Sequence, residues 1–238
     1  MKVSVISETG GRENNEDAVG RLRANGKYCF VLADGIGGQG SGEVASELAV
    51  QTVLNCFKAQ PDISPELMYA YLEAAQNAII EERAANTRRK NMGTTITVLI
   101  TDGSNAIWAH CGDSRIYRLK KHLIQEITDD HSVAFMSFMA GEIRYKDIRI
   151  NPDQNKLLRS LSDGQKFKPD ISDIVKLPSK TSFLLCSDGF WEYVDEDFME
   201  VSRKKTSTPR AWLDAMLEER KRNAPSDADN YSAIAVFI

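Results

Sequence analysis

The stretch "VLADGIGGQGSGEVASELAV", residues 31–50, decides between two folds, because it joins an apolar strand to a helix through a cluster of glycines. Gly35, Gly37 and Gly40 match the dinucleotide-binding pattern G-x-G-x-x-G, in the strand-to-helix context that this pattern requires. Asp34, however, stands directly before the first glycine. Its carboxylate would repel a bound pyrophosphate, whereas it would attract a metal ion.

The elements that follow this stretch argue against a dinucleotide-binding unit. Such a unit returns from its first helix directly to a parallel strand. Here the helix that begins near Ser41 is followed by a second helix, expected from about Ser64 to Arg89, with apolar residues at helical spacing. The sequence therefore predicts a different fold class.

Groups of strands alternate with pairs of helices along the whole chain. Three strand-like runs precede the first helix, and four more follow Gly93 at the short spacing of an antiparallel sheet. After a less regular segment come the remaining elements, which we expect as strands at 170–177 and 181–189, helices at 195–204 and 209–222, and a strand at 231–238. This order predicts an α+β fold, in which two antiparallel sheets form a central β-sandwich flanked by antiparallel helix pairs.

Length and composition narrow the class of protein. A chain of 238 residues with 42% hydrophobic positions can bury one sizeable core, so we expect a single domain over residues 1–238. The net charge of −4 and the dispersed cations argue against nucleic-acid binding. The apolar runs are far shorter than the roughly 20 residues of a membrane span, and four widely separated cysteines do not suggest a zinc ribbon. We expect a cytoplasmic protein that does not engage a membrane.

Five aspartates stand at or beside the end of an apolar strand, each close to a turn: Asp17, Asp34, Asp113, Asp188 and Asp229. One such aspartate is usually a turn residue. Five carboxylates gathered at one end of a sandwich would repel one another unless a cation neutralised them. Oxygen ligands select hard ions such as Mg²⁺ or Mn²⁺, and the three scattered histidines do not argue for zinc. The pattern predicts a metal centre.

Two further features fit such a centre. Gly35 and Gly189 each follow one of these aspartates, and a residue without a side chain lets the backbone carbonyl approach a metal. Arg12 lies five residues before Asp17 and directly after two glycines. Its planar guanidinium matches two oxygens of a phosphate group, although a lone arginine in a loop is more often simply solvated.

Seven ordered segments resemble one family, the metal-dependent serine/threonine protein phosphatases of the PP2C (PPM) type, and in particular its compact bacterial members. They are "GGRENNEDA", "VLADGIGGQGSGEVAS", "MGTTITVLI", "HCGDSRIYRL", "TDDHSV", "CSDGFWEYV" and "DNYSAIAV". The resemblance runs from about residue 4 to 237. It implies the family's β-sandwich with flanking helix pairs, in agreement with the order of elements.

The resemblance also implies roles for particular residues. Asp34 would bridge two Mn²⁺ or Mg²⁺ ions, the Gly35 carbonyl would bind one of them, and Asp188 and Asp229 would complete the other. Asp17 would act on the metals largely through bound water, and Asp113 would hold a third metal together with Asp188. Arg12 falls where the family places its phosphate-binding arginine. Glu16 and Asn230 stand beside these ligands as supporting residues.

The activity implied is hydrolysis of phosphoserine and phosphothreonine on proteins, by direct attack of a metal-bridging hydroxide. The expected partners are phosphoprotein substrates of a cognate kinase, and the expected state is a monomer. Ile36 departs from the eukaryotic pattern, in which a histidine proposed as general acid stands there. The segment from about 131 to 156 corresponds to the family's variable flap, where "INPDQN" replaces a common His-Pro pairing.

Two other functions remain open at this point. One is a catalytically inactive PP2C-like scaffold or binding module, which the presence of Asp34, Asp188 and Asp229 disfavours. The other is an enzyme of the same metal chemistry that acts on a small phosphorylated molecule, which the sequence separates poorly from a protein phosphatase.

Overall fold

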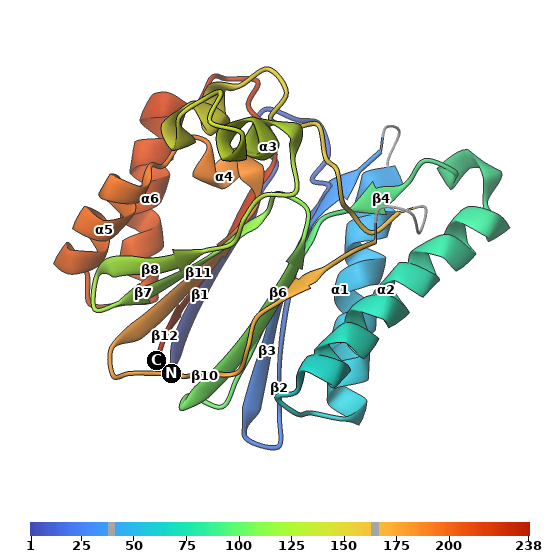
Figure 1. Ribbon diagram of the computed structural model, residues 1–238, viewed down its shortest axis with the longest axis horizontal. Coiled ribbons are helices and arrows are strands. Elements are labelled where there is room, and N and C mark those ends of the chain that lie inside the picture. Colours follow the sequence, from blue (N-terminus) through green and yellow to red (C-terminus); the bar gives the residue numbers. More distant parts are fainter. Residues whose placement is uncertain (38–40, 163–166) are drawn as a thin grey trace.

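The structure, a computed structural model, describes residues 1–37, 41–162 and 167–238. Gly40, the last glycine of the dinucleotide-like pattern, lies outside these residues. The described parts form four layers, with a helix pair on each side of two packed sheets (Figure 1).

Both sheets are antiparallel, and both draw strands from distant parts of the chain. The order of strands in the first sheet is β1 (Lys2–Glu8), β12 (Tyr231–Phe237), β11 (Thr181–Cys186), β7 (Arg115–Lys120) and β8 (Leu123–Ile127). The order in the second is β10 (Val175–Lys176), β6 (Asn105–Cys111), β5 (Ile96–Thr101), β3 (Lys27–Ile36) and β2 (Asp17–Ala24), while β4 (Gly93–Thr94) pairs with β3 and β9 (Asp170–Ile171) with β6. The predicted β-sandwich is confirmed.

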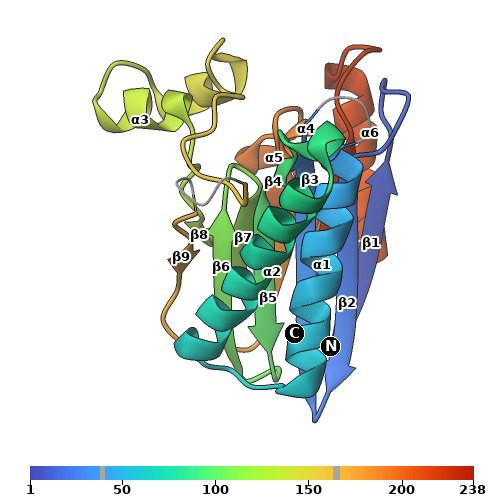
Figure 2. The same cartoon turned by 90° about the vertical axis from the view of Figure 1, so that its right-hand side faces the viewer.

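The helix pairs cover the outer faces of the sheets. α1 (Ser41–Ala59) and α2 (Pro65–Ala85) pack on the second sheet, and α5 (Glu196–Lys205) and α6 (Pro209–Asn223) pack on the first (Figures 1 and 2). Pro65 and Pro209 begin their helices, where a proline loses no hydrogen bond, and Ser64 and Thr208 cap them through their hydroxyls. None of the described helices is both long and apolar enough to cross a bilayer.

Alternation along β3 explains how this strand presents Asp34. Cys29, Val31 and Ala33 pack toward α1 and α2, whereas Phe30 and Leu32 belong to the core between the sheets. Since successive side chains of a strand point to opposite faces, Asp34 shares the inter-sheet face with Phe30 and Leu32. The carboxylate therefore stands where that apolar core ends.

Two elements differ from the expected boundaries. The helix expected to reach Arg89 ends at Ala85, because the side chain of Asn86 accepts a hydrogen bond from Arg88 N and starts a short 3₁₀ helix, η1 (Thr87–Arg89). The strand expected at 170–177 is divided into β9 and β10. Between them, the Ser172 hydroxyl accepts from Trp108 N and replaces a regular ladder contact.

The segment 131–156, which we call the flap, lies over one end of the sandwich (Figure 1). It contains α3 (Val133–Met139), capped by the Ser132 hydroxyl, and a 3₁₀ helix, η2 (Tyr145–Ile150). A further short helix, α4 (Asp188–Trp191), follows β11 on the side of the flap.

Candidate metal centre

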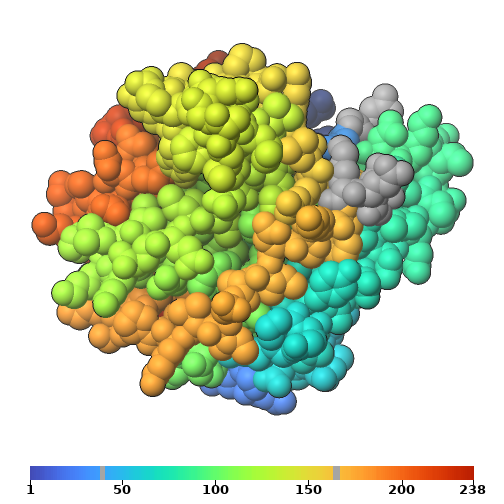
Figure 3. All heavy atoms as spheres, viewed as in Figure 1, coloured from blue at the N-terminus to red at the C-terminus, as the bar shows by residue number. Residues whose placement is uncertain are grey.

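Four of the five predicted aspartates line one cleft at the flap end of the sandwich. The cleft has a volume of about 500 Å³, and its lining includes Asp34, Asp113, Asp188 and Asp229. Flap residue Asn155 forms part of the wall, and the space-filling view shows the yellow-green flap projecting over this end of the molecule (Figure 3). The strand ends that are far apart in the sequence therefore meet at one place.

Asp34 is held by its backbone. Its N–H donates to Thr95 Oγ1 at 3.0 Å, and its carbonyl accepts from Thr94 Oγ1 and Thr95 N, both at 2.8 Å. Gly35 follows directly, and a Cβ built on it would lie 2.3 Å from the carbonyl oxygen of Gly42 in α1. Only glycine fits this close approach of strand and helix, so the backbone beside Asp34 is fixed against α1.

Asp17 lies behind the cleft rather than in its lining. The β2–β3 register pairs it with Asp34, and its Oδ2 accepts from Ser187 Oγ at 2.8 Å. Its other oxygen, Oδ1, is buried and has no hydrogen-bond partner among the described residues. An unsatisfied buried carboxylate oxygen is costly, and a cation or an ordered water would satisfy it.

Asp188 begins α4 shortly after β11, and Asp229 stands just before β12, the strand that pairs with β11. A Cβ built on Gly189 would lie 2.2 Å from the carbonyl oxygen of Asn230, so this position also requires glycine. Buried Arg220 donates to the carbonyls of Gly189 at 2.6 Å and Asp229 at 3.1 Å. This arginine therefore fixes one aspartate relative to the other.

The backbone of Asp113 is held by Trp191, whose ring stacks on the guanidinium of Arg115. The Asp113 carbonyl accepts the indole N–H of Trp191 at 3.0 Å, and the Arg115 guanidinium lies 3.5 Å from the centre of the Trp191 ring. Arg115 also makes a buried, two-pronged ion pair with Asp130, at 2.8 and 2.7 Å. Such a fork restricts both partners, so the turn that carries Asp113 is rigid.

The carboxyls of the cleft strongly perturb one another. Burial raises the pKa of Asp34 well above its ordinary value, and neighbouring aspartates, Asp17 first among them, raise it further. Burial and then Asp188 act in the same way on the pKa of Asp113, and burial and Asp229 raise the pKa of Asp188. Burial also raises the pKa of Asp17 to about 7, although the neighbouring hydroxyls of Ser232 and Ser187 act to lower it. Without a cation, the site favours protonated carboxyls.

Arg12 lies at the rim, beside a neighbouring hollow that shares Asp229 with the main cleft. Its guanidinium donates to Asp229 Oδ2 at 3.1 Å, and the Arg12 side chain is 56% exposed. Asn230 holds the loop that carries it, since the amide donates to the carbonyls of Thr9 and Asn14 and accepts from Glu16 N. The guanidinium therefore remains accessible to an anion, while its loop is anchored.

The donor set of the cleft fits hard divalent cations. It offers carboxylates and backbone carbonyls, and the buried Oδ1 of Asp17 is a further acceptor without a hydrogen-bond partner among the described residues. The carboxyls of Asp34 and Asp188 are close enough for a side-chain hydrogen bond, which lowers the pKa of Asp188 and adds to the raised pKa of Asp34.

A second cluster has metal-like spacing but a different character. The ligand atoms of His110, His131 and Asp170 lie within 4.8 Å of one another. His131 Nδ1 accepts from Gly112 N, so its Nε2 carries the proton and donates to Asp170 at 3.0 Å. Arg159 donates to the same carboxylate at 2.8 Å. A cation of the protein itself thus neutralises Asp170, and both histidines are buried structural residues.

Several residues of the cleft carried no functional signal in the sequence. Thr95 and Ser187 support Asp34 and Asp17 through hydroxyls, and strand alternation could have placed them on the inter-sheet face. Arg83 of α2 lines the cleft. Gln154 of the flap is buried beside Asp188 and lowers the pKa of that carboxyl. Nothing local in "INPDQN" indicates this approach, because it depends on how the flap folds back.

A protein-family model, that of Protein phosphatase 2C, matches residues 8–224. The chain belongs to the protein phosphatase 2C (PP2C) family. This PP2C chain is 30% identical over 231 residues to the serine/threonine phosphatase stp of Listeria monocytogenes serotype 4b (strain F2365), covering 94% of this chain and 90% of that protein.

Solved structures of serine/threonine phosphatases are similar over the length of the chain. The serine/threonine phosphatase Stp1 from Staphylococcus aureus is 26% identical, with a TM-score of 0.89 over 100% of this chain and 95% of that one. The catalytic domain of the serine/threonine protein phosphatase PstP, in complex with two manganese ions, is 25% identical, with a TM-score of 0.84 over 100% of this chain and 98% of that one. The PP2C resemblance seen in the seven sequence segments is confirmed.

Proposed function

We propose that the acidic cleft is the active site at which this PP2C enzyme hydrolyses phosphoserine and phosphothreonine on proteins. The chain is a serine/threonine protein phosphatase of the PP2C type by family. The observation that carries the assignment of the site is the convergence of Asp34, Asp113, Asp188 and Asp229 on one cleft, with an accessible arginine at its rim.

The proposed ligands are the residues at the strand ends. Asp34 and the carbonyl of Gly35 would hold one divalent ion, and Asp34 with Asp188 and Asp229 would hold another. Asp113 is placed to hold a third ion together with Asp188. When bound, such ions would supply a strong nucleophile at neutral pH and neutralise the charge of the phosphoryl group. Manganese is the ion found with the relative PstP, and Mg²⁺ or Mn²⁺ suits this donor set.

The chain's own residues bind and orient the substrate. Arg12 would turn its fork from Asp229 toward two phosphate oxygens, which its exposure permits. Ser187 and Thr95 hold Asp17 and Asp34 in place, so that the ligand oxygens need little reorganisation. Ile36 lines the cleft and cannot transfer a proton, so leaving-group protonation falls to another group. No side chain needs to form a covalent intermediate.

The finer expectations stay predictions. A cytoplasmic monomer that opposes a serine/threonine kinase fits the family, the composition and the lack of a membrane-spanning helix among the described elements. A single catalytic domain over residues 1–238, with the flap at about 131–156, is likewise our proposal. The inactive-scaffold alternative gains no support, because every predicted ligand carboxylate is present.

The test is hydrolysis of a phosphothreonine peptide with EDTA, Mg²⁺ and Mn²⁺ compared side by side. We expect turnover only with metal, and its loss in Asp34→Asn but not in the matched control Asp214→Asn, which changes an exposed aspartate of α6. A small aryl phosphate assayed in parallel separates a protein substrate from a small-molecule one, through the ratio of the two kcat/KM values. Folded protein without turnover in any metal would overturn the proposal.

A further inference from the structure

A second hollow lies at the other end of the first sheet and is lined by cations. Its volume is about 490 Å³, and its lining includes Lys2, Lys121, Lys180, Arg203 and Lys204, with no aspartate or glutamate. We call it the basic pocket. None of these five cations forms an ion pair within the described ranges. The chain as a whole has a net charge of −4, so these five cations without ion-pair partners form a local excess of positive charge.

Two of these lysines occupy strained backbone positions. Lys121 and Lys180 have φ values of 61° and 64°, in the left-handed region that favours glycine or asparagine. The only other described non-glycine residue with positive φ is Asn25. Lys121 N donates to Lys180 O at 2.9 Å, so the two turns lie side by side, as the lime and orange segments do in Figure 3. Strain of this kind gathers at functional sites more often than elsewhere.

Arg203 is fixed in place as a third cation. Its Nε donates to Ser182 Oγ at 2.9 Å and its Nη1 to the carbonyl of Thr206 at 3.1 Å. The guanidinium lies 3.7 Å from the centre of the Phe237 ring. A cation that is already oriented loses little side-chain entropy when an anion binds.

The helix dipole explains only part of this charge. Arg203 and Lys204 stand in the last turn of α5, where cations stabilise the helix end. The other three cations are not at a helix end: Lys2 lies in β1, and Lys121 and Lys180 lie in turns. Their convergence therefore needs another reason.

We propose that the basic pocket binds a small anion carrying two or more phosphate groups. Several cations from separate elements surround a concave site whose volume suits a nucleotide-sized ligand. Multiply charged phosphate chains match such a group best, because each added charge finds another cation. The proposal is independent of the assigned phosphatase site.

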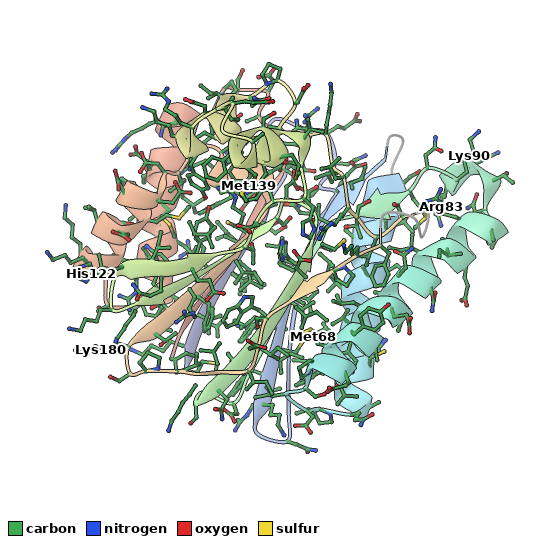
Figure 4. All side chains as sticks on the ribbon, viewed as in Figure 1. Met68, Arg83, Lys90, His122, Met139 and Lys180 are labelled. Atoms are coloured by element: carbon green, nitrogen blue, oxygen red, sulfur yellow. The ribbon has the colours of Figure 1, made fainter. Side chains whose placement is uncertain are left out.

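The pocket is separate from the acidic cleft. β7, β11 and β12 lead from the aspartates at one end to the basic residues at the other, over six or seven residues, or about 20 Å. In Figure 4, His122 and Lys180 lie together at one edge, whereas Arg83 of the acidic cleft lies on the opposite side. EDTA removes any metal that could bind a phosphate in the acidic cleft, and the lysine variants below assign the remaining binding to the basic pocket.

The experiment is calorimetric titration of the full chain with inorganic triphosphate, ATP and GTP, in EDTA at low salt. We expect saturable binding that weakens as salt rises. Equal affinity for triphosphate and ATP would assign recognition to the phosphate chain, and tighter ATP or GTP binding would add the nucleoside, either of which supports the pocket. Absence of binding to all three at about millimolar ligand would overturn the proposal, since affinities in that range are the weakest that matter.

The decisive variant is Lys121→Gly together with Lys180→Gly. Glycine relieves the strain, so the melting temperature should rise, while loss of two cations should weaken triphosphate binding roughly tenfold or more. Asn25→Gly is the matched control, because it relieves the same kind of strain without removing charge. Lys58→Gln with Lys90→Gln controls for net charge. Unchanged binding in the double glycine variant, or an equal loss in either control, would show that the lysines form no site.

Discussion

The side chain of Asp17 is buried, and one of its carboxylate oxygens has no hydrogen-bond partner among the described residues. Three other carboxyls lie near it, those of Asp34, Asp188 and Asp229. The Oδ2 of Asp17 is satisfied by Ser187, whereas Oδ1 has no partner among the residues described. A carboxylate in this position is unfavourable for the folded state by itself and favourable once a cation is bound. Asp17 thus lowers the stability of the metal-free protein, and the same unsatisfied oxygen favours the binding of a cation at the site.

This arrangement predicts an unusual pH dependence of the metal-free protein. Burial raises the pKa of Asp17 to about 7 from an ordinary value of 3.8. Between those pH values the unfolded chain has already lost this proton while the folded chain keeps it, so Asp17 lowers stability as pH rises from about 4 to 7. The loss is on the order of 4 kcal/mol. Asp17→Asn should make that slope shallower, measured by urea unfolding in EDTA, while the raised pKa values of Asp34, Asp113 and Asp188 keep part of it. Identical slopes for the two proteins would contradict the assignment.

Arg12 is a second residue whose individual role can be tested, and it lies at the rim of the acidic cleft. Because its ion pair with Asp229 is largely exposed, Arg12→Ala should change the free energy of unfolding by less than about 1 kcal/mol. Loss of a charged contact to the phosphoryl group should lower kcat/KM on a phosphopeptide about thirtyfold, which corresponds to roughly 2 kcal/mol of lost transition-state stabilisation. Arg12→Lys keeps the charge without the fork and should fall between. Unchanged steady-state kinetics in Arg12→Ala would remove the residue from the site.

At the scale of elements, the flap is connected to the cleft through α4. Arg149 of η2 donates to the carbonyls of Trp191 at 2.7 Å and Val194 at 3.3 Å, and pairs with Glu196 at 2.6 Å. The indole of Trp191 in turn holds Asp113. The position of the flap and the position of a ligand carboxylate therefore depend on one arginine.

Arg149→Met should loosen this connection. Removing a largely buried arginine leaves carbonyls and Glu196 unpaired, which should cost about 2–3 kcal/mol of unfolding free energy. Amide exchange should accelerate in α3 and η2, and phosphatase activity should fall. Arg144→Met is the matched control, since the Arg144–Asp147 pair lies in the same segment and Arg144 is 71% exposed. Equal effects of the two variants would show that the flap is not held through Arg149.

At the scale of the whole molecule, the two sheets bring charges of opposite sign to opposite ends. The acidic end is destabilised by its own repulsion, so a cation that binds only the folded state should stabilise the entire fold. The structural relative PstP was solved in complex with two manganese ions, and the cleft of this chain offers carboxylates that suit such an ion.

Added Mn²⁺ should therefore raise the melting temperature of the metal-free protein. At a hundredfold excess over Kd, one site contributes about 2.7 kcal/mol, or roughly 5–10 °C for a domain of this size. Asp188→Asn should melt no lower than the wild type in EDTA, because one repelling charge is gone, and should gain less from Mn²⁺. Asp214→Asn, outside the cleft, should behave as the wild type. A full Mn²⁺ shift in Asp188→Asn would rule that carboxylate out as a ligand.

Local patterns predicted most of the elements but not all of their ends. The apolar run of β3 and the helical spacing in α1 were visible because each depends on residues close in the sequence. The end of α2 at Ala85 depends on one side-chain cap at Asn86, and the break between β9 and β10 depends on the contact of Ser172 with Trp108. Such boundaries are decided by single hydrogen bonds, to which periodicity is insensitive.

The sequence by itself determined the four-layer fold class, the family and the set of aspartates that stand at strand ends, because these follow from local periodicity and from ordered segments. Only the tertiary structure decided which of them share a cleft, with four in the lining and Asp17 behind it. It alone placed Gln154 beside Asp188 and gathered the lysines of the basic pocket from separate elements. The physical reason is that strand register and the packing of one sheet on another join residues more than two hundred positions apart, a distance over which no local pattern carries information.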